Sequence, residues 1–327
     1  MSTKSRVTHH AGLLQPPPES RRAEYLAALE ARLVARWGPS RVAVLAMALA
    51  MLLWTFIEIV GGVALASMPP LELIWLRYLI HLTLMLLVVG RSDPMRLVRT
   101  DYPLRHVGRS LLMLGMPLCW VLAARYLPMP TLLSIFWTVP IIAVLLAAIL
   151  LRERVPQRTV VPLGVGYLGI VGVLRPSAPH SGIGVLLALG MCGCFALYLV
   201  GTRWLRREST QVNLFHSAFS VFVTLSFVMP FIWRWPSAAA VLPVILIGVL
   251  GYVLLWFIDR ATHLASVATI APIAFLQPAV EVLWFTLMGG GVVGRSVTLG
   301  AVLVAIAIVI TTRMTRNDDK GAVGHSA

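Results

Sequence analysis

Long apolar blocks alternate with short polar and basic segments along most of the chain. Each block is roughly long enough to cross a hydrocarbon core of about 30 Å. Continuous apolar runs of this length predict helices, because the strands of a membrane barrel alternate apolar and polar residues over about ten positions. The pattern therefore predicts an all-α integral membrane protein with ten transmembrane helices, at 43–65, 70–89, 107–125, 130–151, 159–174, 182–203, 213–233, 238–258, 264–288 and 296–312.

Polar and basic segments flank the apolar blocks. Residues 1–42 are predicted to form a cytoplasmic N-terminal tail, and residues 313–327 a cytoplasmic C-terminal tail. An amphipathic helix in the membrane interface is predicted over 23–37, with a disordered, partly helical tail as the alternative. Its apolar stripe recurs at spacings of three and four residues, at Leu26, Leu29, Leu33 and Trp37.

Composition agrees with a membrane protein. The 327 residues are 58% hydrophobic and 12% charged, whereas a soluble domain carries charge on about a quarter of its residues. The net charge of +14 comes from 27 Lys and Arg against 13 Asp and Glu. Such a balance can indicate nucleic acid. Here the basic residues lie between apolar blocks, so we expect the lipid bilayer as the partner and no nucleic acid.

The positions of the basic residues predict an orientation. Placing every Lys and Arg puts 22 on the side of the two termini, four on the opposite side, and Arg77 within a span. By the positive-inside rule, both termini are expected to be cytoplasmic, in a plasma (inner) membrane. Arg109 and Arg260 count as residues of cytoplasmic loops. Glu153 lies in a basic cytoplasmic turn, where we expect a structural pair at the inner end, with Arg152, Arg154 or Arg158.

Two prolines indicate an internal repeat. Pro140 is followed 13 residues later by Glu153, and Pro278 is followed 13 residues later by Gly291. An offset of 138 residues therefore overlays the fourth block on the ninth. Five is an odd number, so two five-helix repeats cross the membrane in opposite senses, as in many secondary transporters with a site at the repeat interface. The predicted repeats are 43–174 and 182–312.

Short motifs follow one another in a set order along these spans. The motifs are Pro69-Pro70 before the second span, Arg77 within it, Pro140, Leu151-Arg152-Glu153-Arg154-Val155, glycines in the fifth span, and Ser181-Gly182 at the sixth. In this order the chain resembles EamA-type transporters of the drug/metabolite transporter superfamily, over about 43–312. Gly291 departs from the family pattern, in which a second glutamate often stands. The resemblance implies transport of a small metabolite, frequently export.

Charges deep in a span are costly, so they usually face a bundle interior or a cavity. Glu58 is one turn after Trp54. It is either a cavity carboxylate that binds a cationic substrate or carries a proton, or a structural partner of Arg77. Arg77 either holds a carboxylate or phosphate, or acts as a strut or snorkels to the outer interface. His81, one turn on, is expected to be a packing residue, with a proton relay as the alternative.

Glu281 belongs to the most site-like cluster in the sequence. Gln277, Glu281 and Trp284 share one helix face beside Pro278, which frees a backbone carbonyl. A polar bond between helices is the alternative. We expect Glu58 and Glu281 to be the proton-coupling candidates. Aromatic residues are expected to complete the substrate pathway and hold a ring-bearing or cationic solute, with apolar packing as the alternative, at Trp54, Trp137, Tyr252 and Trp256.

These features favour a secondary transporter of a small metabolite or drug-like solute, working by alternating access, with export and proton coupling expected. No phosphate-binding loop indicates ATP as the energy source. The alternative is a membrane-embedded enzyme acting on a lipid-linked substrate, which requires catalytic residues that no recognisable spacing provides. We therefore expect no enzyme activity, catalytic residue, cofactor or metal. The substrate stays open, as does the choice between monomer and homodimer.

Overall fold

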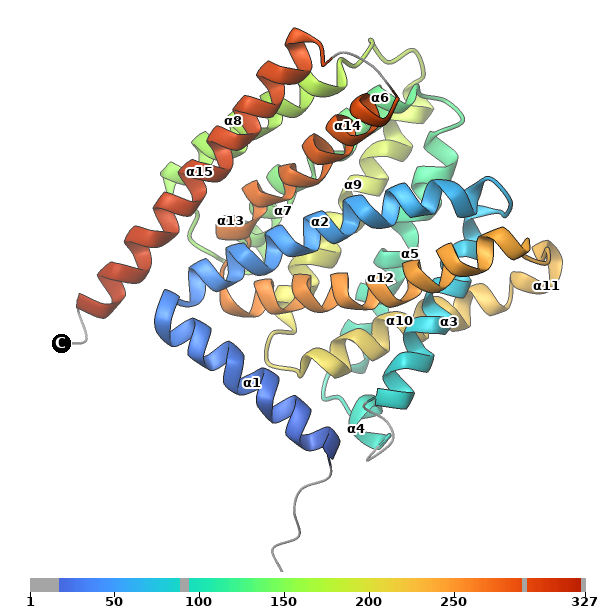
Figure 1. The fold of residues 1–327 in the computed structure, drawn as a ribbon, viewed down its shortest axis with the longest axis horizontal. Helices are drawn as coiled ribbons and strands as arrows, with labels where there is room; N and C mark the ends of the chain where they lie inside the picture. The colour runs from blue at the N-terminus through green and yellow to red at the C-terminus, as the bar shows by residue number, and fades with distance from the viewer. Residues whose placement is uncertain (1–17, 89–93, 290–292, 325–327) are drawn as a thin grey trace, which may run out of the picture.

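The computed structural model describes residues 18–88, 94–289 and 293–324, and these residues form helices joined by turns and short loops (Figure 1). The first half contains α1 (Pro18–Trp37), α2 (Pro39–Leu65), α3 (Pro70–Val88), α4 (Met95–Val98), α5 (Pro103–Ala123), α6 (Met129–Phe136), α7 (Val139–Leu150) and α8 (Gln157–Leu174). The second half contains α9 (Gly182–Trp204), α10 (Thr210–Ser226), α11 (Met229–Ile232), α12 (Ala238–Leu264), α13 (Val267–Ile270), the 3-10 helix η1 (Ala271–Phe275), α14 (Leu276–Met288) and α15 (Arg295–Gly324).

Nine helical segments in the described residues are long and apolar enough to cross a membrane. They match every predicted block except 213–233, which the chain divides between α10 and α11, of 17 and 4 residues. The all-α membrane fold is therefore confirmed, whereas the number of ten spans stays a prediction. α15 continues beyond the predicted boundary at 312, because no proline or glycine interrupts the chain before Gly321.

A single offset of 138 residues aligns the two halves. Adding 138 to Gln157, the first residue of α8, gives Arg295, the first residue of α15. The break that separates α6 from α7, at 137–138, maps onto 275–276, where η1 ends and α14 begins. Both interrupted spans have a proline at the second position of the helix that carries it, Pro140 in α7 and Pro272 in η1. Proline has no N–H for the helical hydrogen bond, which favours a break there.

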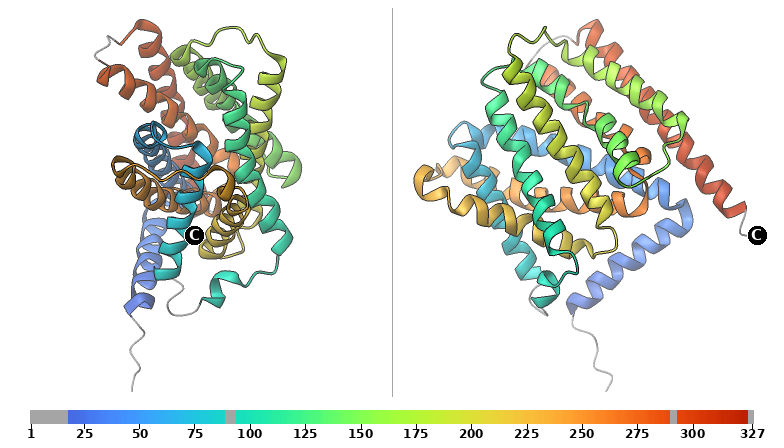
Figure 2. Two further views of the ribbon diagram at one scale, coloured as in Figure 1. Left: turned by 90° about the vertical axis from the view of Figure 1, so that its right-hand side faces the viewer. Right: turned by 180° about the vertical axis from the view of Figure 1, so that it is seen from behind.

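The packing of the helices follows the same correspondence. The α2–α12 contact is repeated by α5–α9, the α3–α12 contact by α5–α10, and the α7–α9 contact by α2–α14. Two contacts are their own counterparts, α8–α15 and α3–α10. Figure 1 shows α2 beside α12 and α8 beside α15, and the view from behind in Figure 2 shows α5 beside α9. Exchanging the two halves therefore leaves these principal helix contacts unchanged.

Two glycines bring α8 and α15 close together. A Cβ atom on Gly169 would lie 2.7 Å from the carbonyl oxygen of Gly300, and a Cβ atom on Gly300 would lie 2.5 Å from that of Gly169. Helix pairs in membranes use such small residues to bring their backbones into contact. This contact excludes any side chain at either position.

Several arginines that the sequence assigns to cytoplasmic loops lie inside helices. For Arg109 and Arg260, which lie well inside α5 and α12, the loop assignment is wrong. Arg109 is 3% exposed in α5. Arg260 lies in α12 and forms an ion pair with Glu30 of α1. Both helices extend past their apolar blocks, because polar partners satisfy these side chains. Arg109 donates to Thr202 Oγ1 at 3.0 Å, to Ser217 Oγ at 2.7 Å and to the carbonyl oxygen of Asn213.

Candidate functional site

Two glutamates on neighbouring helices are held in the same way. Trp54 Nε1 donates to Glu58 Oε1 at 2.8 Å on α2, and Gln277 Nε2 donates to Glu281 Oε2 at 2.8 Å on α14. In each case the donor is four residues earlier, on the same helix face. Thr55 Oγ1 donates to the carbonyl oxygen of Gln277 at 3.2 Å, which ties the two helices together. We call Glu58 and Glu281 the acid pair, and their charges act on each other.

The acid pair lies at the same depth as Arg77. Glu58 and Glu281 are each seven residues before the ends of α2 and α14, and Arg77 is seven residues after the start of α3. With a rise of 1.5 Å per residue, all three lie about 10 Å from those helix ends. We call this the outer end, because the sequence predicts that it faces outside. The side chain of Glu58 has exposed surface at this level of the bundle, and that of Glu281 is half-buried.

Arg77 does not form the structural ion pair with Glu58 that the sequence leaves open, since Glu58 bonds to Trp54 instead. The charge of Arg77 still acts on Glu58. Its guanidinium lies against α12, where a Cβ atom on Gly251 would be 2.6 Å from Arg77 Nε. The structure thus brings two acids and one arginine to the same level of the membrane span.

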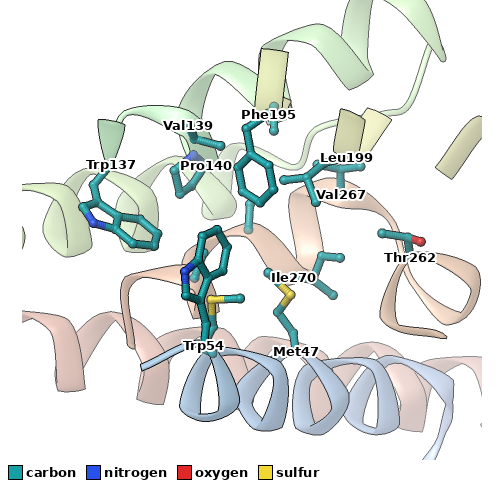
Figure 3. A pocket seen from close by; sticks show the side chains of 14 residues that line it. Met47, Trp54, Trp137, Val139, Pro140, Phe195, Leu199, Thr262, Val267 and Ile270 are labelled. Atoms are coloured by element: carbon teal, nitrogen blue, oxygen red, sulfur yellow. The ribbon is translucent and has the colours of Figure 1, made fainter. Parts of the chain in front are cut away.

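Aromatic rings surround Trp54 below the acid pair. Its ring centroid is 5.3 Å from that of Phe195, 6.1 Å from that of Trp137 and 6.3 Å from that of Phe136. In Figure 3, Trp54 and Trp137 point toward the same space, with Phe195 beside them. The indole Nε1 of Trp137 is buried and has no hydrogen-bond partner. The aromatic cluster therefore offers ring faces and one unused N–H group.

The space that these rings border is a cavity at the interface of the two halves. The cavity is narrow, with a volume of about 20 Å³ available to the centres of water molecules. Its lining is apolar or aromatic apart from Thr262, and comes from α2, α7, α9, α12, α13 and η1. The lining residues are Met47, Met51, Trp54, Trp137, Val139, Pro140, Ala143, Phe195, Leu199, Thr262, Val267, Ile270, Ala271 and Ala274.

The predicted site residues divide into two groups. Trp54 and Trp137 line the cavity, and Glu58 is hydrogen-bonded to Trp54. Gln277 and Glu281 are bonded to each other next to α2, and the charges of Glu281 and Arg77 act on Glu58.

Two predicted aromatic residues lie elsewhere. Tyr252 contacts His81, with ring centroids 5.0 Å apart, and Trp256 contacts Phe257 at 5.1 Å. Trp284 is 43% exposed and does not line the cavity. The sequence analysis missed Phe195 and the methionines of α2, because an apolar residue in an apolar helix carries no signal of its own.

An ion pair closes the opposite end of the cavity. Arg203 Nε donates to Glu153 Oε1 at 2.7 Å, so the predicted pairing of Glu153 with Arg152, Arg154 or Arg158 is wrong. The other carboxylate oxygen accepts from the backbone N–H of Val267 at 3.0 Å. We call Glu153 and Arg203 the inner ion pair; their side chains are only 11% and 13% exposed.

The inner ion pair joins the two halves. Glu153 follows α7 in the first half, and its backbone N–H donates to the carbonyl of Ala147. Arg152, just before it, has the left-handed conformation with φ 54°, which ends the helix and fixes the position of Glu153. Arg203 Nη1 donates to the carbonyls of Thr262 and His263 at the end of α12. Thr262 and Val267 also line the cavity. Glu153 and Arg203 are 50 residues apart in sequence, and their ion pair holds the cavity-lining segments together at this end.

A metal site has no support in the described ranges. Within 18–88, 94–289 and 293–324, no group of three or more His, Cys, Asp or Glu side chains is placed to hold a metal ion.

Comparisons with known proteins show similarity to transporters. Residues 41–175 match the EamA-like transporter family. The chain is 23% identical over 209 residues to an S-adenosylmethionine uptake transporter of Rickettsia prowazekii (strain Madrid E), a match that covers 63% of this chain and 71% of the relative. It is 25% identical over 148 residues to a riboflavin transporter of Brucella anthropi, over 45% of this chain and 52% of the relative.

A solved crystal structure has the same fold. It superposes with a TM-score of 0.73 at 20% sequence identity, over 84% of this chain and 98% of that chain. The matched family and the names of the relatives indicate a transporter rather than an enzyme. Residues 41–175 thus match the EamA-like transporter family and the named relatives are transporters, which together support an EamA-type transporter of the drug/metabolite transporter superfamily.

Proposed function

We propose that this transporter carries a small, ring-bearing organic cation across the plasma (inner) membrane by secondary transport. The observation that carries the proposal is the acid pair above an aromatic cluster. Glu58 and Glu281 each keep one oxygen free of the intrahelical bond that holds them. Ring faces and carboxylates both attract cations. S-adenosylmethionine, which the Rickettsia relative is named for, joins a sulfonium cation to an adenine ring, and we take it as the first candidate.

Proton coupling follows from the charges of the acid pair. Like charges in one site favour the binding of a proton or a cation between them. Without substrate the site holds one proton, and it releases this proton when the cation binds. Proton and substrate therefore move in opposite directions. Glu58 and Glu281 are the proposed carriers of this proton.

Alternating access follows from the two ends of the cavity. Glu58 has exposed surface near the outer end, and the inner ion pair joins the two halves at the other end. Opening toward the cytoplasm requires Glu153 to separate from Arg203, while the halves close over the acid pair. The interrupted spans α6–α7 and α13–α14 provide the hinges, because a 3-10 segment within a span often marks such a point.

The direction of net transport is open to measurement. The sequence analysis predicts export, whereas the Rickettsia relative is named for uptake. Proteoliposomes with the substrate supplied from either side distinguish the two. Cytoplasmic termini remain part of this proposal, and protease protection of tags at both ends tests them.

Uptake of labelled S-adenosylmethionine into proteoliposomes tests the function. With an acidic lumen and a neutral exterior, protons leave and the cation is expected to accumulate. Glu58→Gln and Glu281→Gln should each lower uptake at least about tenfold, since a hydrogen bond or contact to a charged group is worth about 1.5–3 kcal/mol. Each should also remove the dependence on the proton gradient. Riboflavin is neutral, so the acid pair gives it no advantage.

Asp101→Asn is the matched control, because Asp101 is an exposed acid in the loop before α5. Its uptake should equal that of the wild-type protein. Undiminished transport by both glutamine variants, with an unchanged pH profile, would show that the acid pair does not carry the function.

A further inference from the structure

Arg77 is a charged residue inside the bundle whose guanidinium has no bonded partner. In the described part of the chain, it forms neither a hydrogen bond nor an ion pair, and its Nε is buried. A buried or partly buried charge in a span normally pairs with a carboxylate or with backbone carbonyls. The unmet donors of Arg77 therefore point to an anion that the chain itself does not supply.

The position of the guanidinium is fixed by its neighbours. It fills the space that Gly251 leaves on α12, where a Cβ atom would be 2.6 Å from Nε and 3.1 Å from Nη2. On its own helix, Cζ lies 5.6 Å from the ring centroid of Tyr78. A side chain held in this way loses little conformational freedom when a ligand binds.

Two further polar side chains beside Arg77 also have unmet hydrogen-bonding capacity. Among the described residues, the buried hydroxyl of Tyr78 has no hydrogen-bond partner, and neither has either ring nitrogen of the fully buried His81. The rings of Tyr78 and His81 stack at 6.0 Å. Buried polar groups are normally hydrogen-bonded, so three neighbouring exceptions on α3 mark one polar region.

We propose that Arg77 forms a carboxylate subsite, so that the transported cation also carries a carboxylate group. The inference rests on the proposed function. It narrows the substrate to a ring-bearing cation that also carries a zwitterionic head group. Guanidinium groups bind carboxylates through two parallel hydrogen bonds. Arg77 is at the depth of the acid pair, so one ligand spans both.

The charges of the site favour a carboxylate over a phosphate. With both acids ionised, Glu58, Glu281 and Arg77 carry one net negative charge. A ligand with two cationic groups and one carboxylate has one net positive charge and neutralises the site. A dianionic phosphate would add repulsion from Glu58, whose charge and that of Arg77 act on each other.

The test compares S-adenosylmethionine with its decarboxylated analogue, which keeps the sulfonium, the amine and the adenine ring. Uptake by the wild-type protein in proteoliposomes is expected to favour the carboxylated compound at least about tenfold in kcat/KM. In Arg77→Gln this preference should fall to about one, mainly through loss of the carboxylated compound. Arg77→Lys keeps the charge without the paired donors and should retain part of the preference. Arg175→Gln, an exposed arginine after α8, should retain all of it.

A second variant keeps the arginine in place. Gly251→Ala puts a methyl group where the guanidinium lies, so the preference should fall while the positive charge stays. Size-exclusion profiles and thermal unfolding show which variants are folded.

The possible outcomes distinguish the proposed function from the carboxylate subsite. Uptake of neither compound by the wild-type protein overturns the proposed function and the subsite together. Equal uptake of both compounds overturns the subsite alone. The same holds if folded Arg77→Gln and Gly251→Ala proteins lower uptake of both compounds by one common factor, because that result indicates a strut.

Discussion

The outer and inner ends of the cavity are built from corresponding helices but carry different chemistry. Under the offset of 138 residues, Glu58 corresponds to Ala196 and Glu281 to Ala143, and both alanines are fully buried. Conversely, Glu153 of the inner ion pair corresponds to Gly291, and Arg203 to Leu65. The acids of the proposed site are thus confined to one end, and the ion pair that joins the halves to the other.

The difference separates two tasks that a symmetric fold would otherwise mix. The principal helix contacts repeat between the halves, so the packing of the backbone alone does not favour closing one end over the other. The side chains then favour one choice, because at these corresponding positions of the described residues the ion pair between the halves lies at the inner end. We therefore expect the protein at rest to be closed on the cytoplasmic side.

Breaking the inner ion pair should have the largest effect on this asymmetry. Glu153→Gln loses hydrogen bonds to a charged group, worth about 1.5–3 kcal/mol, which corresponds to a roughly ten- to hundredfold shift in population. A thiol reagent applied to inside-out vesicles should therefore label Thr262→Cys faster by that factor. The native cysteines provide the baseline.

Glu30→Gln is the matched control for that experiment. It breaks the ion pair between α1 and Arg260, which lies at the same end but outside the cavity lining. Its labelling rate should stay at the baseline. Equal rates in Glu153→Gln and the parent protein would mean that another contact closes the inner end.

The contact between α8 and α15 joins corresponding helices of the two halves, so a change there should affect stability without favouring either end. Gly169→Ala places a Cβ atom 2.7 Å from the Gly300 carbonyl oxygen. Overpacking of this kind costs about 1–3 kcal/mol of stability, which should appear as a lower Tm in detergent without a change in which end is open. Gly164 lies on the same helix, and a Cβ atom there would have no neighbouring heavy atom within 4 Å, so the Tm of Gly164→Ala should not fall. A similar loss in both variants would indicate that helix flexibility, rather than the close contact, decides.

The smallest effect is expected from the donor that holds Glu58. Trp54→Phe keeps a ring in the aromatic cluster and removes only the Nε1–H bond to Glu58. One such bond contributes about 0.5–1.5 kcal/mol, so KM for the cation should rise about two- to tenfold. Trp284→Phe changes an indole that is exposed and outside the cavity lining, and its KM should stay constant. If both variants raise KM equally, the hydrogen bond is not the cause.

The sequence predicts most of the fold because lipid imposes a simple rule on each span. Apolar length locates the helices, and Pro140 and Pro278 reveal the offset that the packing follows. The rule fails at helix ends. Arg109 looks like a loop residue, yet the hydroxyls of Thr202 and Ser217 allow it to be buried within α5.

The site is predictable only where a residue is unusual for its surroundings. Glu58 and Glu281 are evident as acids in apolar runs, and their i−4 donors follow from helix periodicity. Tyr252 and Trp256 show the limit, because aromatic residues are common in membrane helices for packing alone. The inner ion pair requires knowledge of how α7 and α9 pack, which local sequence does not contain.

The constant offset also describes a second conformation. The offset of 138 residues aligns the end of α3 with the end of α10 and the start of α8 with the start of α15. Each residue between these points in one half therefore has a counterpart in the other half. If the halves exchange backbone conformations residue by residue, the open end and the closed end exchange as well. The 3-10 turn at 271–275 then appears at 133–137, and 271–275 takes the regular helix now found at the end of α6. One set of local conformations thus serves as the template for both states of the transport cycle.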